Sequence, residues 1–162
     1  MTAGPRTKTP PTGTIVNLKP ELDTGDAQRL LAMVMGHPTP TRLEEVCQVY
    51  RFLPEWHVFG YRVGGDVVAF IGIQLLTSRE AVIRHIAVLP QRRKQGIGRA
   101  LIGHSLKRLA LFRLTAETDA DAVGFYHTCG FTAASLGTDG RGVERFTCVL
   151  ALEVQPQPGT TP

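Results

Sequence analysis

The chain has 162 residues, of which 43% are hydrophobic, so it is long enough for one domain with a true core and too short for two. Its formal net charge of +4 is modest, and four of the cations lie together at Arg92, Arg93, Lys94 and Arg99. This placement favours a small polyanionic ligand and argues against nucleic acid, which needs a broader basic face interleaved with aromatic side chains.

No apolar stretch approaches the roughly eighteen residues that a membrane helix requires, and no signal-peptide region opens the sequence. We therefore expect a cytoplasmic protein without a membrane partner. Cys47, Cys129 and Cys148 are odd in number and show no metal-ligand spacing, which predicts free thiols and no metal site. No histidine motif pairs with them, which argues against a cysteine nucleophile.

The first third of the chain predicts a tail, a strand and two helices. Residues 1–13 are rich in threonine, proline and glycine and are expected to form a flexible tail. Residues 14–18 read as a strand, and a helix is expected from Asp23 or Thr24 to Gly36. A second helix is expected to start with a capping box formed by Thr41 and Glu44.

Three strands follow in close succession. Residues 56–63 and 67–76 flank a Gly-Gly-Asp turn, and residues 81–89 form an apolar run that ends at Pro90. Such short connections predict a three-stranded antiparallel meander.

A basic, glycine-containing loop joins this meander to an amphipathic helix that ends near Leu109. Gly96 and Gly98 allow a tight turn, which leaves the first amides of the helix directed at open space. Such amides and the positive helix end favour a phosphate or pyrophosphate. A Walker A loop is excluded by its pattern, and a dinucleotide fold by Leu101 where a third glycine is needed. A solvated basic turn remains the plain alternative.

The last third predicts a strand over residues 114–118, a short helix over residues 120–129 with Gly130 at its end, and strands over residues 131–136 and 145–152. Residues 153–162 are expected to be a flexible tail. The fold class is therefore α/β (α+β), in a single domain.

Two motifs in this frame resemble those of the GNAT N-acetyltransferases. The first is Arg93-Lys94-Gln95-Gly96-Ile97-Gly98, preceded by Ile86-Ala87-Val88 and Pro90, and the second runs from Asp119 through Phe125-Tyr126 to Gly130-Phe131. The resemblance covers residues 14–152. It implies a β-α-α-β-β-β-α-β-α-β-β order and a mixed, largely antiparallel sheet with one splayed parallel strand pair.

The resemblance also implies acetyl-CoA as co-substrate and assigns residues to it. The amides of Gly96, Ile97, Gly98, Arg99 and Ala100 would hold the pyrophosphate, with Arg93, Lys94 and Gln95 beside them. The backbone of Ile86, Ala87 and Val88 would bind the pantetheine arm, and the Val88 amide would polarise the thioester carbonyl. Asp119 stands where the family usually has asparagine, which puts the contact made there in doubt.

For catalysis, the resemblance implies that Tyr126 protonates the departing thiolate. A base must deprotonate the amine, yet Arg84 and His85 stand where many relatives have a carboxylate. His85 is either that base or a packed strand histidine, and Glu117 and Asp119 are further base candidates on the next strand.

The expected function is acetyl transfer to a primary amine of a small molecule, in a ternary complex. Protein or peptide acetylation and a non-catalytic acyl-CoA sensor are the alternatives, and a homodimer stays open. The acceptor is expected near Tyr50, Phe52, Trp56 and His57, although these residues suit core packing equally well.

Overall fold

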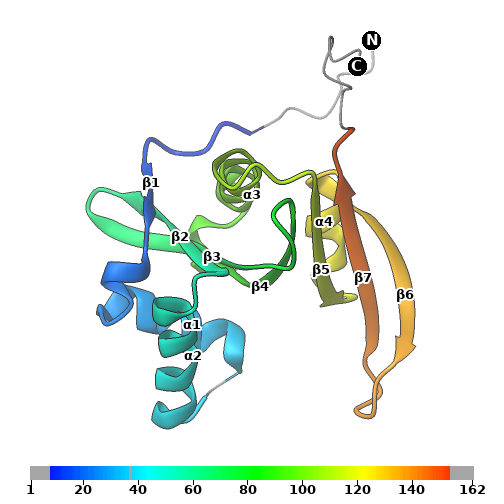
Figure 1. The fold of residues 1–162 in the computed structure, drawn as a ribbon, viewed down its shortest axis with the longest axis horizontal. Coiled ribbons are helices and arrows are strands. Elements are labelled where there is room, and N and C mark those ends of the chain that lie inside the picture. The colour runs from blue at the N-terminus through cyan, green and yellow to red at the C-terminus, as the bar shows by residue number, and fades with distance from the viewer. Residues whose placement is uncertain (1–7, 37, 154–162) are drawn as a thin grey trace, which may run out of the picture.

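The computed structural model describes residues 8–36 and 38–153, in which one seven-stranded sheet lies between two layers of helices (Figure 1). The strands are β1 (Thr14–Asn17), β2 (Trp56–Val63), β3 (Asp66–Leu75), β4 (Glu80–Val88), β5 (Arg113–Asp119), β6 (Thr132–Thr138) and β7 (Glu144–Ala151). The helices are α1 (Gly25–Met35), α2 (Pro40–Phe52), α3 (Ile97–Arg108) and α4 (Val123–Thr128), with short 3-10 turns η1 (Lys19–Glu21) and η2 (Pro90–Arg92). The predicted tail segments 1–7 and 154–162 lie outside the described residues.

The strands are arranged in the order β1-β2-β3-β4-β5-β7-β6. Only β4 and β5 pair in parallel among the strands that the structure describes, and the other five pairings are antiparallel. The fold prediction is confirmed, including the order of helices and strands.

Two helix starts differ from their predictions. The cap of α2 is Thr39, whose hydroxyl accepts a hydrogen bond from the Arg42 amide at 3.2 Å, so the predicted capping box at Thr41 was wrong. Pro40 takes the first helical position because its φ suits a helix and it has no amide to leave unpaired. The last helix starts at Val123 rather than at residue 120, because the Asp119 carboxylate holds the preceding amides in a turn.

Each face of the sheet is covered by its own helices and has its own core. Ile71 and Ile73 of β3 pack on the side of α3 and α4, whereas Phe70 packs on the side of α1 and α2. In Figure 1, β2, β3 and β4 lie between α3 above and α1 and α2 below, and β5, β7 and β6 stand upright at the right. Alternation along the strands therefore decides which helix layer a residue meets.

A β-bulge in β4 changes this alternation at the centre of the sheet. Ile83 pairs with Ile73 and His85 pairs with Gly72, so Arg84 is the additional residue on β4. Because of the bulge, Ile83 and Ile86 both pack toward α3, and His85 meets the side chain of Tyr50 from α2. The bulge thus directs His85 to the α1/α2 side.

The parallel pair separates at the same point. The β4–β5 register runs from Glu80 opposite Arg113 to Ile83 opposite Ala116 and stops there. Beyond it, Glu117 and the rest of β5 pair only with β7, while β4 continues beside β3. The two strands therefore diverge into an open wedge, as the predicted splay requires.

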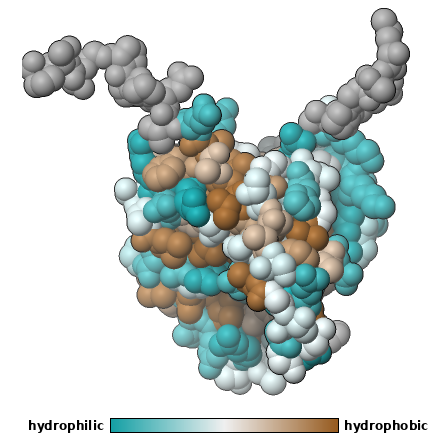
Figure 2. All heavy atoms as spheres, turned by 90° about the vertical axis from the view of Figure 1, so that its right-hand side faces the viewer, coloured by the Kyte–Doolittle hydropathy of each residue, from teal (hydrophilic) through white to brown (hydrophobic). Residues whose placement is uncertain are grey.

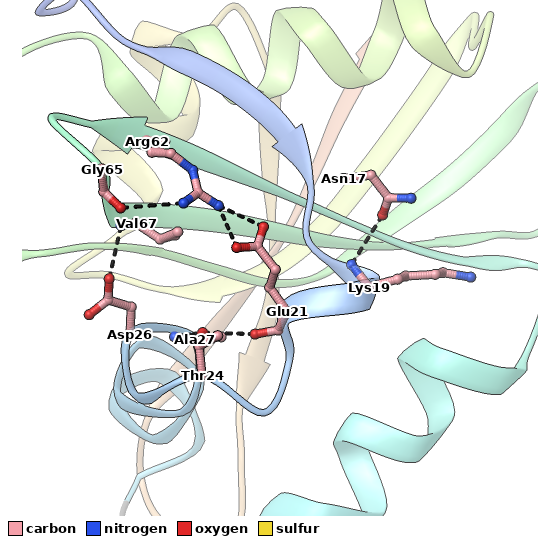
Figure 3. Close-up of polar contacts among 9 residues, drawn as sticks. All are labelled: Asn17, Lys19, Glu21, Thr24, Asp26, Ala27, Arg62, Gly65 and Val67. Atoms are coloured by element: carbon pink, nitrogen blue, oxygen red, sulfur yellow. Dashed lines mark hydrogen bonds and ion pairs between the residues drawn. The ribbon is translucent and has the colours of Figure 1, made fainter.

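Polar contacts fix α1 and η1 against the β2–β3 hairpin (Figure 3). Arg62 Nη2 lies 2.6 Å from both carboxylate oxygens of Glu21, and Asp26 Oδ2 accepts a hydrogen bond from the Val67 amide at 3.0 Å. Thr24 caps α1 by accepting a hydrogen bond from the Ala27 amide at 3.4 Å. These contacts hold the α1 layer in register with the sheet.

β6 forms one edge of the sheet, and six of its seven residues are exposed. Hydrophobic and hydrophilic side chains are interspersed on this side of the molecule (Figure 2). Within residues 8–36 and 38–153, no helix combines the length and the apolar character needed to span a bilayer.

Candidate functional site

The loop before α3 presents a run of unpaired backbone donors. Gly96 has a φ of 83° and caps α3, and Lys94 has a φ of 62°, in the left-handed region that non-glycine residues rarely enter. The amides of residues 94–99 donate no hydrogen bond within the described part of the chain. Because these donors lie at the positive end of a helix, the loop is suited to bind an anion.

Cationic side chains surround these amides. The Arg93 Nε donates to the Val88 carbonyl oxygen at 3.1 Å, and the Arg99 Nη1 donates to the Thr128 carbonyl oxygen at 3.3 Å. Lys94 lines a cavity of about 450 Å³ next to the loop. Arg93, Lys94 and Arg99 of the predicted cluster of positive charge therefore have contacts near the start of α3.

The segment that precedes β1 also lies at this loop. Lys8, Thr9 and Pro11 line the same cavity as Lys94 and Gln95. The Tyr61 hydroxyl donates to the Pro11 carbonyl oxygen at 2.5 Å, and a Cβ added to Gly96 would lie 2.6 Å from the Lys8 carbonyl oxygen. This close approach leaves room only for glycine at position 96.

The backbone of β4 faces the wedge between β4 and β5. The Leu89 amide donates to the Val68 carbonyl oxygen at 2.9 Å, so Leu89 directs its polar groups toward β3. The backbone N–H and C=O groups of successive strand residues point to opposite edges of the strand. Those of Ala87 therefore point toward β3, and those of Ile86 and Val88 point toward β5. Of the three predicted residues, Ile86 and Val88 therefore offer backbone groups in the wedge.

Tyr126 lies in the core, and its hydroxyl keeps some contact with solvent. The residue is 5% exposed, and its ring packs edge-on against Phe125 and Phe131 with centroids 5.2 Å apart. The hydroxyl makes no hydrogen bond to described residues. Every fully buried side-chain oxygen or nitrogen among these residues has a partner, so the Tyr126 hydroxyl oxygen is not fully buried. Burial is the main cause that raises the pKa of Tyr126, which keeps the phenol protonated.

A contact between Gly98 and Phe125 brings these parts together. A Cβ added to Gly98 would lie 2.9 Å from two Phe125 ring atoms and 3.8 Å from a Val88 methyl carbon. The start of α3, the end of β4 and the helix that holds Tyr126 therefore meet at one place.

The two carboxylates predicted on β5 have different environments. Asp119 Oδ1 accepts hydrogen bonds from the amides of Asp121 and Ala122 at 3.0 and 3.1 Å, so one of its oxygens is occupied in a turn. Glu117 is exposed and lies one residue past Ala116, the last residue paired with β4. Because Ala116 packs toward α3, Glu117 faces the opposite side of the sheet, as His85 does.

His85 is held by Tyr50 on that side of the sheet. Tyr50 is fully buried, and its hydroxyl lies 2.6 Å from His85 Nδ1. It occupies a notch above Gly72, where an added Cβ would be 1.9 Å from the hydroxyl oxygen. Burial, with smaller effects of Arg84 and Arg42, lowers the pKa of His85 to about 4, so the imidazole is neutral at physiological pH.

The hydrogen bond assigns the tautomer of His85. A buried hydroxyl that accepted a proton from Nδ1 would leave its own proton unpaired, at a cost of about 1–3 kcal/mol. Tyr50 therefore donates to Nδ1, and the neutral ring carries its proton on Nε2. Nε2 has no hydrogen-bond partner among the described residues and is not buried, so it offers a free N–H.

His85 lines a cavity of about 410 Å³ between α1, α2 and the sheet. Its lining consists of Met35, Pro38, Arg42, Glu45, Val46, Val49, Trp56 and His85. Of the residues expected around the acceptor, Trp56 lines it and Tyr50 lies beside it. Phe52 is 70% exposed, and His57 stacks on Phe59 with centroids 6.5 Å apart, so neither is in its lining.

Sequence reasoning missed the α2 residues Arg42, Glu45, Val46 and Val49, which line this cavity. Their spacing of three and four residues places them on one helix face, so the sequence alone could have predicted that they lie together. Gly72 was missed as well, because its role depends on which side chain of another element lies above it.

All three cysteines are free, and the described residues contain no group of three His, Cys, Asp or Glu side chains placed to bind a metal.

Comparisons with known proteins agree with this geometry. Over 76 residues, the chain is 26% identical to an uncharacterized N-acetyltransferase from the lysA 3' region of Bacillus methanolicus, in a match that covers 47% of this chain and 63% of that relative. The crystal structure of the ribosomal-protein-S18-alanine N-acetyltransferase from Escherichia coli superposes with a TM-score of 0.71 at 22% identity, over 93% of this chain and all of that one. An acetyltransferase from Elizabethkingia anophelis with acetyl-CoA bound gives a TM-score of 0.65 at 16% identity, over 86% of this chain and 98% of that one.

These structural identities support a shared fold. A sequence profile described as the acetyltransferase (GNAT) family matches residues 27–131, which include the loop, the wedge and Tyr126. The chain therefore belongs to the acetyltransferase (GNAT) family.

Proposed function

We propose that this protein is an acetyl-CoA-dependent N-acetyltransferase that acts on a primary amine of a small molecule. The observation that carries the proposal is the run of amides at residues 94–99 that are unpaired within the described part of the chain, beside a strand wedge lined by the Val88 amide. A diphosphate fits the loop because helix-terminal amides and the cations Arg93, Lys94 and Arg99 stabilise it. A pantetheine arm fits the wedge because Ile86 and Val88 direct backbone groups there.

In the proposed reaction the amine and acetyl-CoA react directly in a ternary complex. The amine nitrogen forms a bond to the thioester carbon, and the Val88 amide stabilises the oxyanion that develops on the carbonyl oxygen. The carbon–sulfur bond then breaks, and the thiolate takes the proton of the Tyr126 hydroxyl. The ammonium loses two protons overall: one restores Tyr126 through solvent and the other is released to water, so the products are the N-acetyl amine and CoA.

Glu117 is our proposed base for the amine. It is exposed at the wedge, on the side of the sheet where the cavity lies. Asp119 was a second base candidate, but one of its oxygens accepts hydrogen bonds from two backbone amides. His85 was a third, but the tautomer fixed by Tyr50 leaves no lone pair on Nε2. We therefore assign His85 to binding the acceptor instead of deprotonating it.

The cavity supports a small acceptor. Its volume of about 410 Å³ is of the size that holds small molecules. Peptide acetylation remains the alternative acceptor class, since the superposed Escherichia coli enzyme is named for a ribosomal protein alanine. Fold alone does not decide between the two.

A non-catalytic acyl-CoA sensor is favoured by one feature: Arg84 and His85 stand where the family resemblance leads us to expect a carboxylate on the central strand. The accessible Tyr126 hydroxyl opposes it, because a sensor needs no proton donor there.

CoA release from acetyl-CoA, measured over a panel of small amines and peptides, tests the proposal when combined with acetyl-CoA binding by calorimetry. Turnover with small amines supports the proposed enzyme, and turnover confined to peptides supports the alternative acceptor. Tight acetyl-CoA binding without turnover on any acceptor would establish the sensor, and absence of binding would contradict all three.

A further inference from the structure

Two arginines lie near His85: Arg42, which lines the cavity, and Arg84, which lies outside the lining, and after burial both help to lower the pKa of His85. Arg42 and Glu45 both line the cavity, and their side chains approach to 3.3 Å. Arg84, the bulge residue next to His85, lies with its guanidinium 5.9 Å from the Trp56 ring centroid. Among the described residues, Glu45 is the one carboxylate in the lining. Its negative charge offsets the positive charge of Arg42 and leaves that of Arg84 uncompensated.

Arg84 is held in place, which makes it useful for recognition. Its Nε and Nη2 donate to Gln74 Oε1 at 2.9 and 2.7 Å, and its guanidinium lies over the Trp56 ring. Gln74 is neutral, so these contacts orient the arginine without cancelling its charge. A guanidinium fixed in this way is suited to a carboxylate.

The third polar group is the Nε2–H of His85, which Tyr50 holds as a donor. A ligand group placed near it must accept a hydrogen bond. The rest of the lining is apolar, from Met35, Pro38, Val46, Val49 and Trp56. The cavity therefore combines donors and cationic charge with a hydrocarbon wall.

From this combination we infer that the acceptor is a small amine that also carries a carboxylate, which binds to the His85 Nε2–H, Arg42 and Arg84. The inference rests on the proposed function and names its substrate class. A diamine is disfavoured because its second ammonium would meet two arginines and an N–H donor.

The strand sets the spacing between the two ends of this acceptor. His85 lies three residues before Val88 on β4, a separation of about 10 Å at the usual rise of a strand. The amine must reach the thioester near Val88 while the carboxylate stays near His85. Several carbon atoms must therefore separate the amine from the carboxylate. An ω-amino acid meets this requirement, whereas in an α-amino acid only one carbon atom lies between the α-amino group and the carboxylate.

A matched substrate series tests the inference. We compare kcat/KM for 4-aminobutyrate and 6-aminohexanoate with the values for butylamine, hexylamine and 1,4-diaminobutane. The carboxylated amines are expected to be preferred by about tenfold or more, the effect of one hydrogen bond to a charged group. Equal values, or a preference for the neutral amines or the diamine, would overturn the inference.

Charge-removing variants locate the effect. Arg42→Gln is expected to raise KM for 6-aminohexanoate about fivefold or more, and by a larger factor than KM for hexylamine, which has no carboxylate. Arg29→Gln is the control, because Arg29 is exposed on α1 and is not in the cavity lining. An equal effect of both variants would show that general charge, and not the cavity, sets the preference.

A separate arm distinguishes failure of the inference from failure of the proposed function. If acetyl-CoA binds but no amine is acetylated, the proposed function fails. Calorimetry of 6-aminohexanoate with the CoA-bound protein then decides the inference alone. Binding that Arg42→Gln weakens supports it, and no binding contradicts it. Acetylation of peptide N-termini in preference to every small amine would also overturn it.

Discussion

The hydroxyl of Tyr50 donates to Nδ1 of His85 at 2.6 Å and thereby joins α2 to the central strand. The contact depends on Gly72, which lies opposite His85 on β3 and leaves space for the phenol. It also depends on the bulge at Arg84, which turns His85 toward this side of the sheet. Three elements therefore combine to fix one proton on Nε2.

Gly72→Ala is expected to lower the free energy of unfolding by about 1–3 kcal/mol, the usual cost of overpacking. The added Cβ would lie 1.9 Å from the Tyr50 hydroxyl oxygen, so the ring must move. Urea unfolding of the two proteins measures the change. Gly103→Ala in α3 is the matched control, since a Cβ there meets nothing within 4 Å and the substitution should stabilise the helix by up to about 1 kcal/mol. Equal effects of the two substitutions on the free energy of unfolding would contradict the close packing of Tyr50 over Gly72.

Acid should destabilise the protein partly through His85. Its folded pKa of about 4 lies below the ordinary histidine pKa of 6.5, so between these values the unfolded chain binds a proton that the folded protein excludes. Stability is therefore fully present above pH 6.5 and falls as the pH drops toward 4, by about 2–3 kcal/mol from this residue. Denaturant unfolding at pH 7 and pH 4.5 should show a smaller loss for His85→Gln than for the wild type. The lowered pKa values of His57 and His104 affect both proteins alike, so an identical loss would remove His85 as the source.

The hydrophobic pattern of the sequence was sufficient for most of the fold. The strand predicted over residues 56–63 matches β2, and glycine at position 96 marked the loop and the start of α3. These features are local: periodicity sets the element type, and a left-handed φ favours glycine.

The features that the sequence did not reveal depend on how strands pair and on contacts between residues far apart in the chain. Residues 81–89 are nearly all apolar, so no break in alternation announces the additional residue Arg84 in β4. Tyr50 and His85 are 35 residues apart, and their contact also needs Gly72 on a third element. The capping residue of α2 was misplaced by two positions because Thr39 and Thr41 flank Pro40 and either offers a hydroxyl. Such outcomes follow from tertiary packing and not from local propensity.

Gly98→Glu is expected to abolish acetyl-CoA binding. The new side chain would start 2.9 Å from the Phe125 ring and bring negative charge to the unpaired amides of the loop. Calorimetry should show a loss of affinity of about 100-fold or more. Gly103→Glu is the control on the same helix, where an added Cβ meets open space, and it should bind as the wild type does. Circular dichroism checks that both variants fold, and unchanged affinity in a folded Gly98→Glu protein would contradict the phosphate assignment.

Tyr126→Phe separates catalysis from cofactor binding. The ring can keep its edge-on contacts with Phe125 and Phe131, and the hydroxyl that is lost makes no hydrogen bond to any described residue. Stability and the Kd for acetyl-CoA should therefore change little, whereas kcat should fall about 100-fold because the thiolate leaves without a proton donor. Steady-state kinetics and calorimetry on the same preparation test both parts. A kcat equal to that of the wild type would remove Tyr126 as the acid, and an equal loss in binding and turnover would assign it to holding the cofactor.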